Sequence, residues 1–140
     1  YMKIYFAASM HGSFEDKEWY FHIASFLKRY GSVLTEDVSR AESNDLGEKR
    51  KNVIVYERDT GWIGVADAVV AEVTTPSLEV GYEIGLAEQL DKPILCLFRR
   101  HDHNMLSPII AGNRHIMVRQ YESMIDVESH LEYFFKHPKG

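Results

Sequence analysis

The sequence predicts a single domain of the α/β class over residues 1–140, with a five-stranded, mostly parallel sheet and helices on both of its faces. The first observation is length, because 140 residues, 45% of them hydrophobic, can form one packed core but not two. The second is pattern: apolar runs of strand length alternate with longer segments of helical period, as in repeated βα units. The third is that no internal repeat or low-complexity linker interrupts this alternation.

The first expected strand covers residues 4–8, a short apolar run. A polar turn at 9–13 leads from it into a helix over 14–30, whose large apolar side chains share one face. Gly31 is placed to end that helix, as glycine often does.

The second expected strand is short, because only residues 33–34 form an apolar pair. A polar loop at 37–46 precedes a second helix that runs to about residue 65 and whose apolar residues form no clean stripe. The run 68–73 is apolar and β-branched almost throughout, which is typical of a strand buried on both faces.

The remaining elements continue the alternation. A third helix is expected over 78–90, and Pro93 opens a strand at 94–98, where a proline at the first position loses no central ladder bond. A last short strand at 115–118 and a helix over 122–136 complete the chain.

Elements in this order form a doubly wound sheet of the flavodoxin or Rossmann type. Such sheets bind ligands beyond the carboxyl ends of their strands. We therefore expect the loops at 8–13, 74–79 and 99–108 to line one crevice.

Composition excludes several classes of partner. The formal charge of −5, from 16 basic and 21 acidic side chains, gives no general field that would attract a nucleic acid polymer. No apolar stretch approaches the ~20 residues that span a bilayer, and the first residues do not resemble the core of a signal peptide. The lone Cys96, in an apolar run, indicates a buried thiol in a reducing compartment, so a cytoplasmic location is expected, or a nuclear one in a eukaryote.

Two loops carry hydroxyl groups next to an expected helix start. In the turn at 9–13, backbone N–H groups and small side chains could bind an anion, and Ser13 could equally act only as the N-cap. Ser77 offers the same two roles before the third helix, where a simple cap is the more economical interpretation. Neither loop has the glycine pattern of a Walker loop or a dinucleotide fingerprint.

Carboxylates near the expected crevice are candidates for chemistry. Glu79 and Glu83 stand four residues apart on one side of the third helix. Gly81 and Gly85 flank Glu83, and because a glycine weakens a helix interior by about 1 kcal/mol, they indicate that a strand or ligand comes close. Spacing alone leaves the role of Asp59 open. The histidines form no metal-binding pattern, and we expect neither a metal nor a cofactor.

The segment 66–85, which reads ADAVVAEVTTPSLEVGYEIG, closely resembles the 2′-deoxynucleoside 5′-monophosphate N-hydrolases of the nucleoside 2-deoxyribosyltransferase superfamily. Further similar stretches follow the same order at 33–36, 92–99 and 106–107. The resemblance implies a flavodoxin-like fold and a homodimer. It also implies cleavage of the N-glycosidic bond of a deoxynucleoside 5′-monophosphate, which gives a free base and 2-deoxyribose 5-phosphate.

The resemblance also implies roles for single residues. Glu83 matches the family's nucleophile, which attacks the anomeric carbon and forms a glycosyl-enzyme. Asp59 matches a second carboxylate that assists base departure or activates water, and Tyr5 matches a tyrosine close to the sugar. The residues that match the phosphate pocket are Ser9, Gly12, Ser77 and, from the neighbouring subunit, Ser107.

Three positions bear on the substrate. Transferases of unphosphorylated nucleosides tend to carry a carboxylate at the place of Ser77, where it would repel a phosphate, so serine favours the monophosphate. His11 stands in the phosphate loop where many animal members have arginine, so phosphate affinity could depend on pH near neutrality. Asp37 stands where they have histidine; if it faces the base, it would prefer an amino-bearing edge, so the base preference does not transfer.

Three functions stay open at this stage. The first is the monophosphate N-hydrolase. The second is a deoxyribosyltransferase, or a hydrolase of ribonucleotides such as CMP. The third is a non-catalytic nucleotide-binding module, which the joint presence of Tyr5, Asp59 and Glu83 disfavours.

Overall fold

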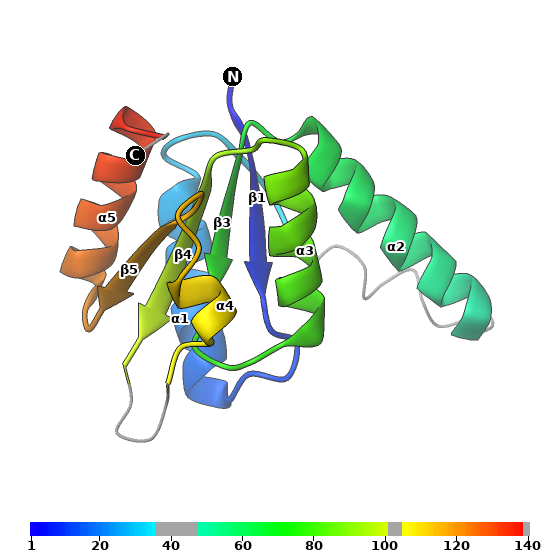
Figure 1. Cartoon of the computed structure of the whole chain (residues 1–140), viewed down its shortest axis with the longest axis horizontal. Coiled ribbons are helices and arrows are strands. Elements are labelled where there is room, and N and C mark those ends of the chain that lie inside the picture. Colours follow the sequence, from blue (N-terminus) through cyan, green and yellow to red (C-terminus); the bar gives the residue numbers. More distant parts are fainter. Residues whose placement is uncertain (36–47, 101–104, 139–140) are drawn as a thin grey trace.

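The computed structural model describes residues 1–35, 48–100 and 105–138, and its described part forms one five-stranded sheet (Figure 1). The strand order is β2-β1-β3-β4-β5, and every neighbouring pair is parallel. This confirms the predicted α/β class, with a sheet that is parallel throughout. The strands are β1 Lys3–Ala8, β2 Ser32–Leu34, β3 Ala68–Glu72, β4 Ile94–Arg99 and β5 Met117–Tyr121.

The helices cover both faces of the sheet (Figure 1). One face of the sheet packs against α1 and α5 and forms one layer of the core. The other face packs against α2 and α3 and forms the second layer. The helices are α1 Phe14–Leu27, α2 Glu48–Val65, α3 Leu78–Gln89, the short α4 Pro108–Ala111 and α5 Met124–Lys136.

The alternation of side chains along β1 divides the core in two. Ile4 and Phe6 point into the layer with α1 and α5, whereas Tyr5 and Ala7 point into the layer with α2 and α3. All residues of β3 are buried, as expected for a central parallel strand with helices on both faces. Tyr5 therefore lies on the same side of the sheet as α2 and α3.

Two element ends lie three residues away from the sequence prediction. The last strand was expected at 115–118 but runs from Met117 to Tyr121, because a turn in which the side chain of Asn113 accepts a hydrogen bond from the His115 N–H, at 2.8 Å, precedes it. The first helix ends at Leu27 instead of residue 30. Beyond it the N–H groups bond to carbonyls three residues earlier, which tightens the last turn.

Glycine at position 31 has a reason in packing. A Cβ atom there would collide with the backbone carbonyl of Met2 at the start of β1, and the N–H of Ser32 bonds to that same carbonyl at 2.9 Å. Gly31 thus lets the chain enter β2 close beside β1, besides following the end of α1.

The carboxyl ends of the strands share one edge, the lower one in Figure 1, where β1 turns into α1 and β3 turns into α3. The predicted loops at 8–13 and 74–79 both lie on this edge. The whole loop at 37–46 and part of the loop at 99–108 fall outside the described residues. None of the described helices combines the length and the apolar character needed to cross a bilayer.

Candidate active site

Glu83 lies in the second turn of α3, on the inner side of the helix. Val80, Ile84 and Ala87 pack the same side of α3 against the sheet, so Glu83 is drawn into the core and is only 4% exposed. The hydroxyl of Tyr5 donates a hydrogen bond to Oε2 of Glu83. Oε1 of Glu83 has no hydrogen-bond partner among the described residues.

This setting changes the acidity of Glu83. Burial is the main cause that raises the pKa of its carboxyl to about 7. The hydrogen bond from Tyr5 and the positive charge of Arg58 act against burial, while the negative charges of Asp59 and Glu79 act with it. Near neutral pH the carboxyl is thus poised between its two protonation states.

Three carboxylates meet at this point. One carboxylate oxygen from each of Asp59, Glu79 and Glu83 lies within 4.8 Å of the others. Asp59 and Glu83 are buried, whereas Glu79, one turn earlier on α3, is exposed. Asp59 comes from α2, so the packing of α2 against α3 brings the two buried carboxylates together.

Arg58 fixes the orientation of Asp59. Its Nε donates to Oδ1 of Asp59 at 3.0 Å, and its Nη2 lies 2.9 Å from the same oxygen. The guanidinium carbon lies 5.0 Å from the ring centre of Trp62, and the Trp62 ring in turn lies 6.4 Å from that of Tyr5. The Trp62 ring therefore lies between Arg58, which binds Asp59, and Tyr5, which binds Glu83.

The turn after β1 is compact and partly buried. Ser9 is 3% exposed, and its Oγ accepts a hydrogen bond from the backbone N–H of His11 at 3.1 Å. The Gly12 N–H bonds to the Ser9 carbonyl at 3.4 Å. A Cβ atom at Gly12 would lie 2.5 Å from the hydroxyl of Tyr20, so no other residue fits there without movement. The His11 side chain is exposed at the mouth of the turn.

Helices α1 and α3, which start at this edge, both have serine N-caps. Ser13 Oγ accepts from the Asp16 N–H at 3.0 Å, and Asp16 returns the bond to the Ser13 N–H at 3.1 Å, which forms a capping box. Ser77 Oγ accepts from the Val80 N–H at 3.2 Å at the start of α3. The two predicted caps are confirmed. Because each bond uses the serine as acceptor, its O–H remains able to donate to a ligand.

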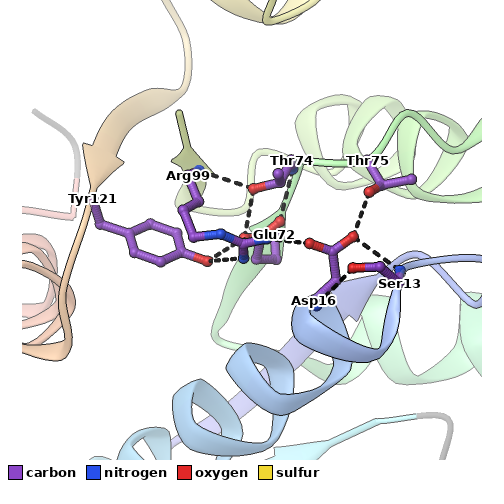
Figure 2. A network of polar contacts seen from close by, with 7 residues as sticks. All are labelled: Ser13, Asp16, Glu72, Thr74, Thr75, Arg99 and Tyr121. Carbon is purple, nitrogen blue, oxygen red and sulfur yellow. Dashed lines mark hydrogen bonds and ion pairs between the residues drawn. The ribbon is translucent and has the colours of Figure 1, made fainter. Parts of the chain in front are cut away.

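A buried polar network, which the sequence did not predict, stands next to these caps (Figure 2). The Asp16 carboxylate accepts from the Thr75 hydroxyl at 2.6 Å and pairs with Arg99. Glu72, fully buried at the end of β3, accepts from Thr74 through its backbone N–H and its hydroxyl, both at 2.7 Å, and from the Tyr121 hydroxyl. Two signals in the sequence could have found this network. Glu72 is an acidic residue inside the apolar expected strand 68–73, and Arg99 directly follows the expected strand 94–98.

The structure brings together part of the predicted site. Tyr5, Asp59 and Glu83 converge between α2, α3 and the end of β1. Ser107 is exposed as the N-cap of α4 and makes no side-chain cap bond. Asp37 lies outside the described residues. Of the two expected neighbours of the α3 glycines, a strand is excluded among the described residues, because Cβ atoms at Gly81 and Gly85 would meet nothing there within 4 Å; the approach of a ligand stays a prediction.

Within the described part of the chain, Asp59, Glu79 and Glu83 are also the group whose ligand atoms are close enough to share a cation. Acidic groups often gather without an ion, and Glu79 is exposed to solvent. We therefore assign the cluster no metal.

A separate hollow, lined among others by Lys92, Arg114 and Arg119, lies at the opposite edge of the sheet, where β4 and β5 begin.

The parallel sheet with helices on both faces defines an α/β domain, and buried carboxylates of α2 and α3 meet beside Tyr5 of β1. Residues 4–129 match the family model of nucleoside 2-deoxyribosyltransferase, and the chain belongs to this family.

Within this family, the chain is similar to several relatives that are named as nucleotide N-hydrolases. The chain is 50% identical over 111 residues to the 5-hydroxymethyl-dUMP N-hydrolase of Rattus norvegicus, a match that covers 78% of this chain and 68% of the relative. It is 41% identical over 143 residues to the enzyme of the same name from Tetraodon nigroviridis, covering 99% of this chain and 100% of the relative. A putative 2′-deoxynucleoside 5′-phosphate N-hydrolase 1 from Syntrophotalea carbinolica is 37% identical over 126 residues, covering 90% and 89%.

Solved structures share the fold at low identity. A CMP N-glycosidase from Clostridium botulinum superposes with a TM-score of 0.67 and 17% identity, covering 93% of this chain and 98% of the other. A 2-deoxyribosyltransferase from Bacillus psychrosaccharolyticus gives a TM-score of 0.73 at 18% identity, with 90% of each chain covered. At these identities the likeness supports the fold alone.

Proposed function

We propose that this protein hydrolyses the N-glycosidic bond of 2′-deoxynucleoside 5′-monophosphates and releases a free base and 2-deoxyribose 5-phosphate. The observation that carries the proposal is the buried pair of Glu83 and Asp59, with oxygens within 4.8 Å of each other and the Tyr5 hydroxyl bound to Glu83. Relatives named as N-hydrolases of such nucleotides support the same reaction.

The separation of the two carboxylates supports a double displacement. Glycosidases that form a covalent intermediate hold their carboxyl groups about 5–5.5 Å apart, whereas those that place water between them need more room. In the proposed first step, an oxygen of ionised Glu83 bonds to the anomeric carbon while the base leaves with the electron pair of the broken bond. Water then attacks the same carbon, gives up a proton, and frees the Glu83 carboxylate.

The raised pKa of Glu83 sets the pH at which the first step can begin. Two carboxylates at this distance resist ionising together, and burial raises the pKa of Glu83 to about 7. In the proposed cycle, Glu83 must be ionised to attack. The departing base takes up a proton at its nitrogen, and Asp59, paired with Arg58, is placed to accept one from the incoming water.

The phosphate is proposed to bind where α1 and α3 begin. Ser9, Gly12 and Ser77 lie on the two turns at this edge, and helix N-termini offer partial positive charge and unpaired N–H groups. Hydroxyl and amide donors of this kind bind a phosphate without help from the net charge of −5. His11 adds a titratable donor at the solvent side.

A homodimer is part of the proposal. Apolar side chains of α2 and α3 are exposed together, with Tyr56 next to Tyr82, and Leu78 is 94% exposed. Gly81 and Gly85 leave open space on the same helix, which would let a second copy approach closely. In such a dimer we expect Ser107, whose exposed side chain makes no cap bond, to reach the phosphate bound by the neighbouring subunit.

The test is product analysis with a panel of substrates. dGMP, dCMP and CMP are each incubated with the native protein, with and without an added acceptor base. The proposal expects free base and 2-deoxyribose 5-phosphate from the deoxynucleotides regardless of acceptor. Formation of a new nucleotide in the presence of acceptor would identify a transferase, and preference for CMP would identify a ribonucleotide hydrolase. Nucleotide binding without base release would indicate a non-catalytic module.

A further inference from the structure

The two turns proposed to hold the phosphate are tied to each other through one side chain. Asp16 caps α1 through the Ser13 N–H, which fixes the turn after β1. The same oxygen, Oδ2, also accepts from the segment before α3, where the Thr75 hydroxyl donates to it at 2.6 Å. Asp16 thus bridges two loops that are 59 residues apart in the sequence.

Arg99 holds Asp16 from the side opposite Thr75. Its Nη2 pairs with Oδ1 of Asp16, while its Nη1 donates to the Tyr121 hydroxyl at 3.3 Å and lies 3.9 Å from Glu72. Its backbone N–H donates to the Thr74 hydroxyl at 2.8 Å. These contacts anchor the bridge to the ends of β3, β4 and β5 (Figure 2).

The charges of Asp16 and Arg99 balance each other within the protein. Burial alone would raise the pKa of Asp16, but the hydrogen bonds from Thr75, Arg99 and Ser13 and the charge of Arg99 outweigh it, so the pKa lies below its usual value. Asp16 and Arg99 are therefore both ionised at neutral pH. The buried guanidinium serves carboxylates of the protein itself, although it stands close to a proposed anion site.

The same chain contains an ordinary version of this cap. Ser123 and Asp126 form a capping box at the start of α5 with the same Ser-x-x-Asp spacing. Among the described residues, the hydrogen bonds of Asp126 stay within its own turn, whereas Asp16 also binds Thr75 and Arg99. Capping an α-helix thus needs none of the additional contacts that Asp16 makes.

We propose that Asp16 is a positioning residue for substrate: held by Arg99 and bonded to Thr75, it sets the distance between the turn at 9–13 and the turn at 74–77, and so the affinity for the 5′-phosphate. It does not contact the substrate itself. The inference rests on the proposed function, because it concerns the same phosphate pocket.

A buried ion pair is weak evidence for stability, since a pair of hydrophobic residues often stabilises a fold as well. Its directional contacts do define geometry, and here they join two segments that both present donors to one edge. Displacing either turn by a fraction of an ångström would misalign donors for a phosphate while leaving Glu83 and Asp59 in place. The expected signature is a change in binding with little change in the chemical step.

Thr75 gives the cleanest test, because one hydroxyl can be removed at nearly constant shape. Thr75→Val is expected to raise the Kd for 2-deoxyribose 5-phosphate, measured by calorimetry, and the KM for the deoxynucleotide by about tenfold, the effect of one lost bond to a charged group. The kcat is expected to change less than about twofold. Thr75→Ser keeps the hydroxyl and is expected to stay near the native values.

Asp16→Asn and Asp126→Asn form a matched pair of cap variants. The first is expected to raise the Kd for 2-deoxyribose 5-phosphate at least as much as Thr75→Val, and the second to leave it unchanged. If Thr75 acts through Asp16, adding Thr75→Val to Asp16→Ala, which leaves no side-chain acceptor for Thr75, causes no further loss. Full additivity would mean that Thr75 binds the phosphate directly, and would overturn the proposal.

Native affinity in Thr75→Val, or an equal loss in Asp126→Asn, would also overturn it. These results would leave the proposed function intact as long as the native protein releases base. If the native protein binds 2-deoxyribose 5-phosphate but releases no base, the positioning role is still measured by the Kd series, and the proposed function alone fails. If it neither binds this sugar phosphate nor releases base, both fail.

Discussion

The hydroxyl of Tyr5, on β1, donates a hydrogen bond to one carboxylate oxygen of Glu83, on α3, and the other oxygen of Glu83 is buried without a hydrogen-bond partner among the described residues. The two residues are 78 positions apart in the sequence. The bond leaves one Glu83 oxygen unengaged, as an attacking carboxylate requires. It also favours the charged form of a group that burial disfavours.

Replacing Tyr5 by phenylalanine is expected to slow the reaction and shift its pH dependence. The hydrogen bond from Tyr5 lowers the pKa of Glu83, so its loss raises that pKa above the native value of about 7. The acid limb of kcat/KM then moves to higher pH, and kcat at neutral pH falls by roughly 10- to 100-fold. Tyr30→Phe, on the other face of the sheet, is the control and should keep the native profile. An unchanged acid limb in Tyr5→Phe would show that the bond does not tune Glu83.

Glu79→Gln is expected to move the same limb in the opposite direction. The negative charge of Glu79 raises the pKa of Glu83, so neutralising it lowers that pKa and extends activity to lower pH. The shift should be roughly half a unit at low salt and smaller at high salt, because Glu79 is exposed and its charge is screened. The exposed Glu122, changed to glutamine, controls for net charge. A shift to higher pH would contradict the assignment.

Glu83→Gln is expected to stabilise the fold while it removes activity. The pKa of Glu83 is about 7 in the folded protein and 4.5 for a glutamate in an unfolded chain. Between these pH values the folded state therefore binds more protons than the unfolded state. Stability from this group is therefore complete below pH 4.5 and is lost as pH rises to 7, by up to about 3 kcal/mol. The variant lacks this loss, so its Tm should exceed the native Tm by roughly 10 °C at pH 8 and by little at pH 5. Equal Tm values at pH 8 would show that ionised Glu83 costs no stability.

Ser77→Asp is expected to change the substrate without harming the helix. Aspartate is as good an N-cap as serine, so α3 should keep its start and the protein its Tm. A carboxylate at this place would repel the 5′-phosphate and raise the KM for a deoxynucleoside monophosphate by roughly 100-fold, while it could accept a hydrogen bond from the 5′-hydroxyl of a nucleoside. Rates with dGMP and deoxyguanosine test this. An unchanged KM for dGMP would place the phosphate elsewhere.

Local patterns in the sequence were enough to predict much of this structure. Apolar runs and helical periods give the order of strands and helices, and a parallel sheet then brings the turns after β1 and β3 to one edge. The caps at Ser13 and Ser77 were predictable because N-capping depends on residues within one turn. Asp59 was ambiguous because α2 has a weak apolar stripe, so its inner face could not be assigned.

The remainder depends on contacts between distant segments. In the sequence, Asp16 resembles any acidic residue in the first turn of a helix. Only folding brings Thr75 and Arg99 into contact with it. The acidity of Glu83 likewise depends on burial and on a partner from β1. Tyr121 was expected beyond the last strand, and its place at the end of β5 makes it a partner of Glu72. Periodicity predicts none of these pairs.

The most direct test of the account is the initial rate of base release from dGMP, or the preferred deoxynucleotide of the panel, by native protein and Glu83→Gln at pH 8. Glutamine keeps the shape of the side chain but cannot attack the anomeric carbon. We expect the rate to fall by roughly 1,000-fold or more, with the fold intact by its Tm. Base release by Glu83→Gln at the native rate would contradict Glu83 as the nucleophile.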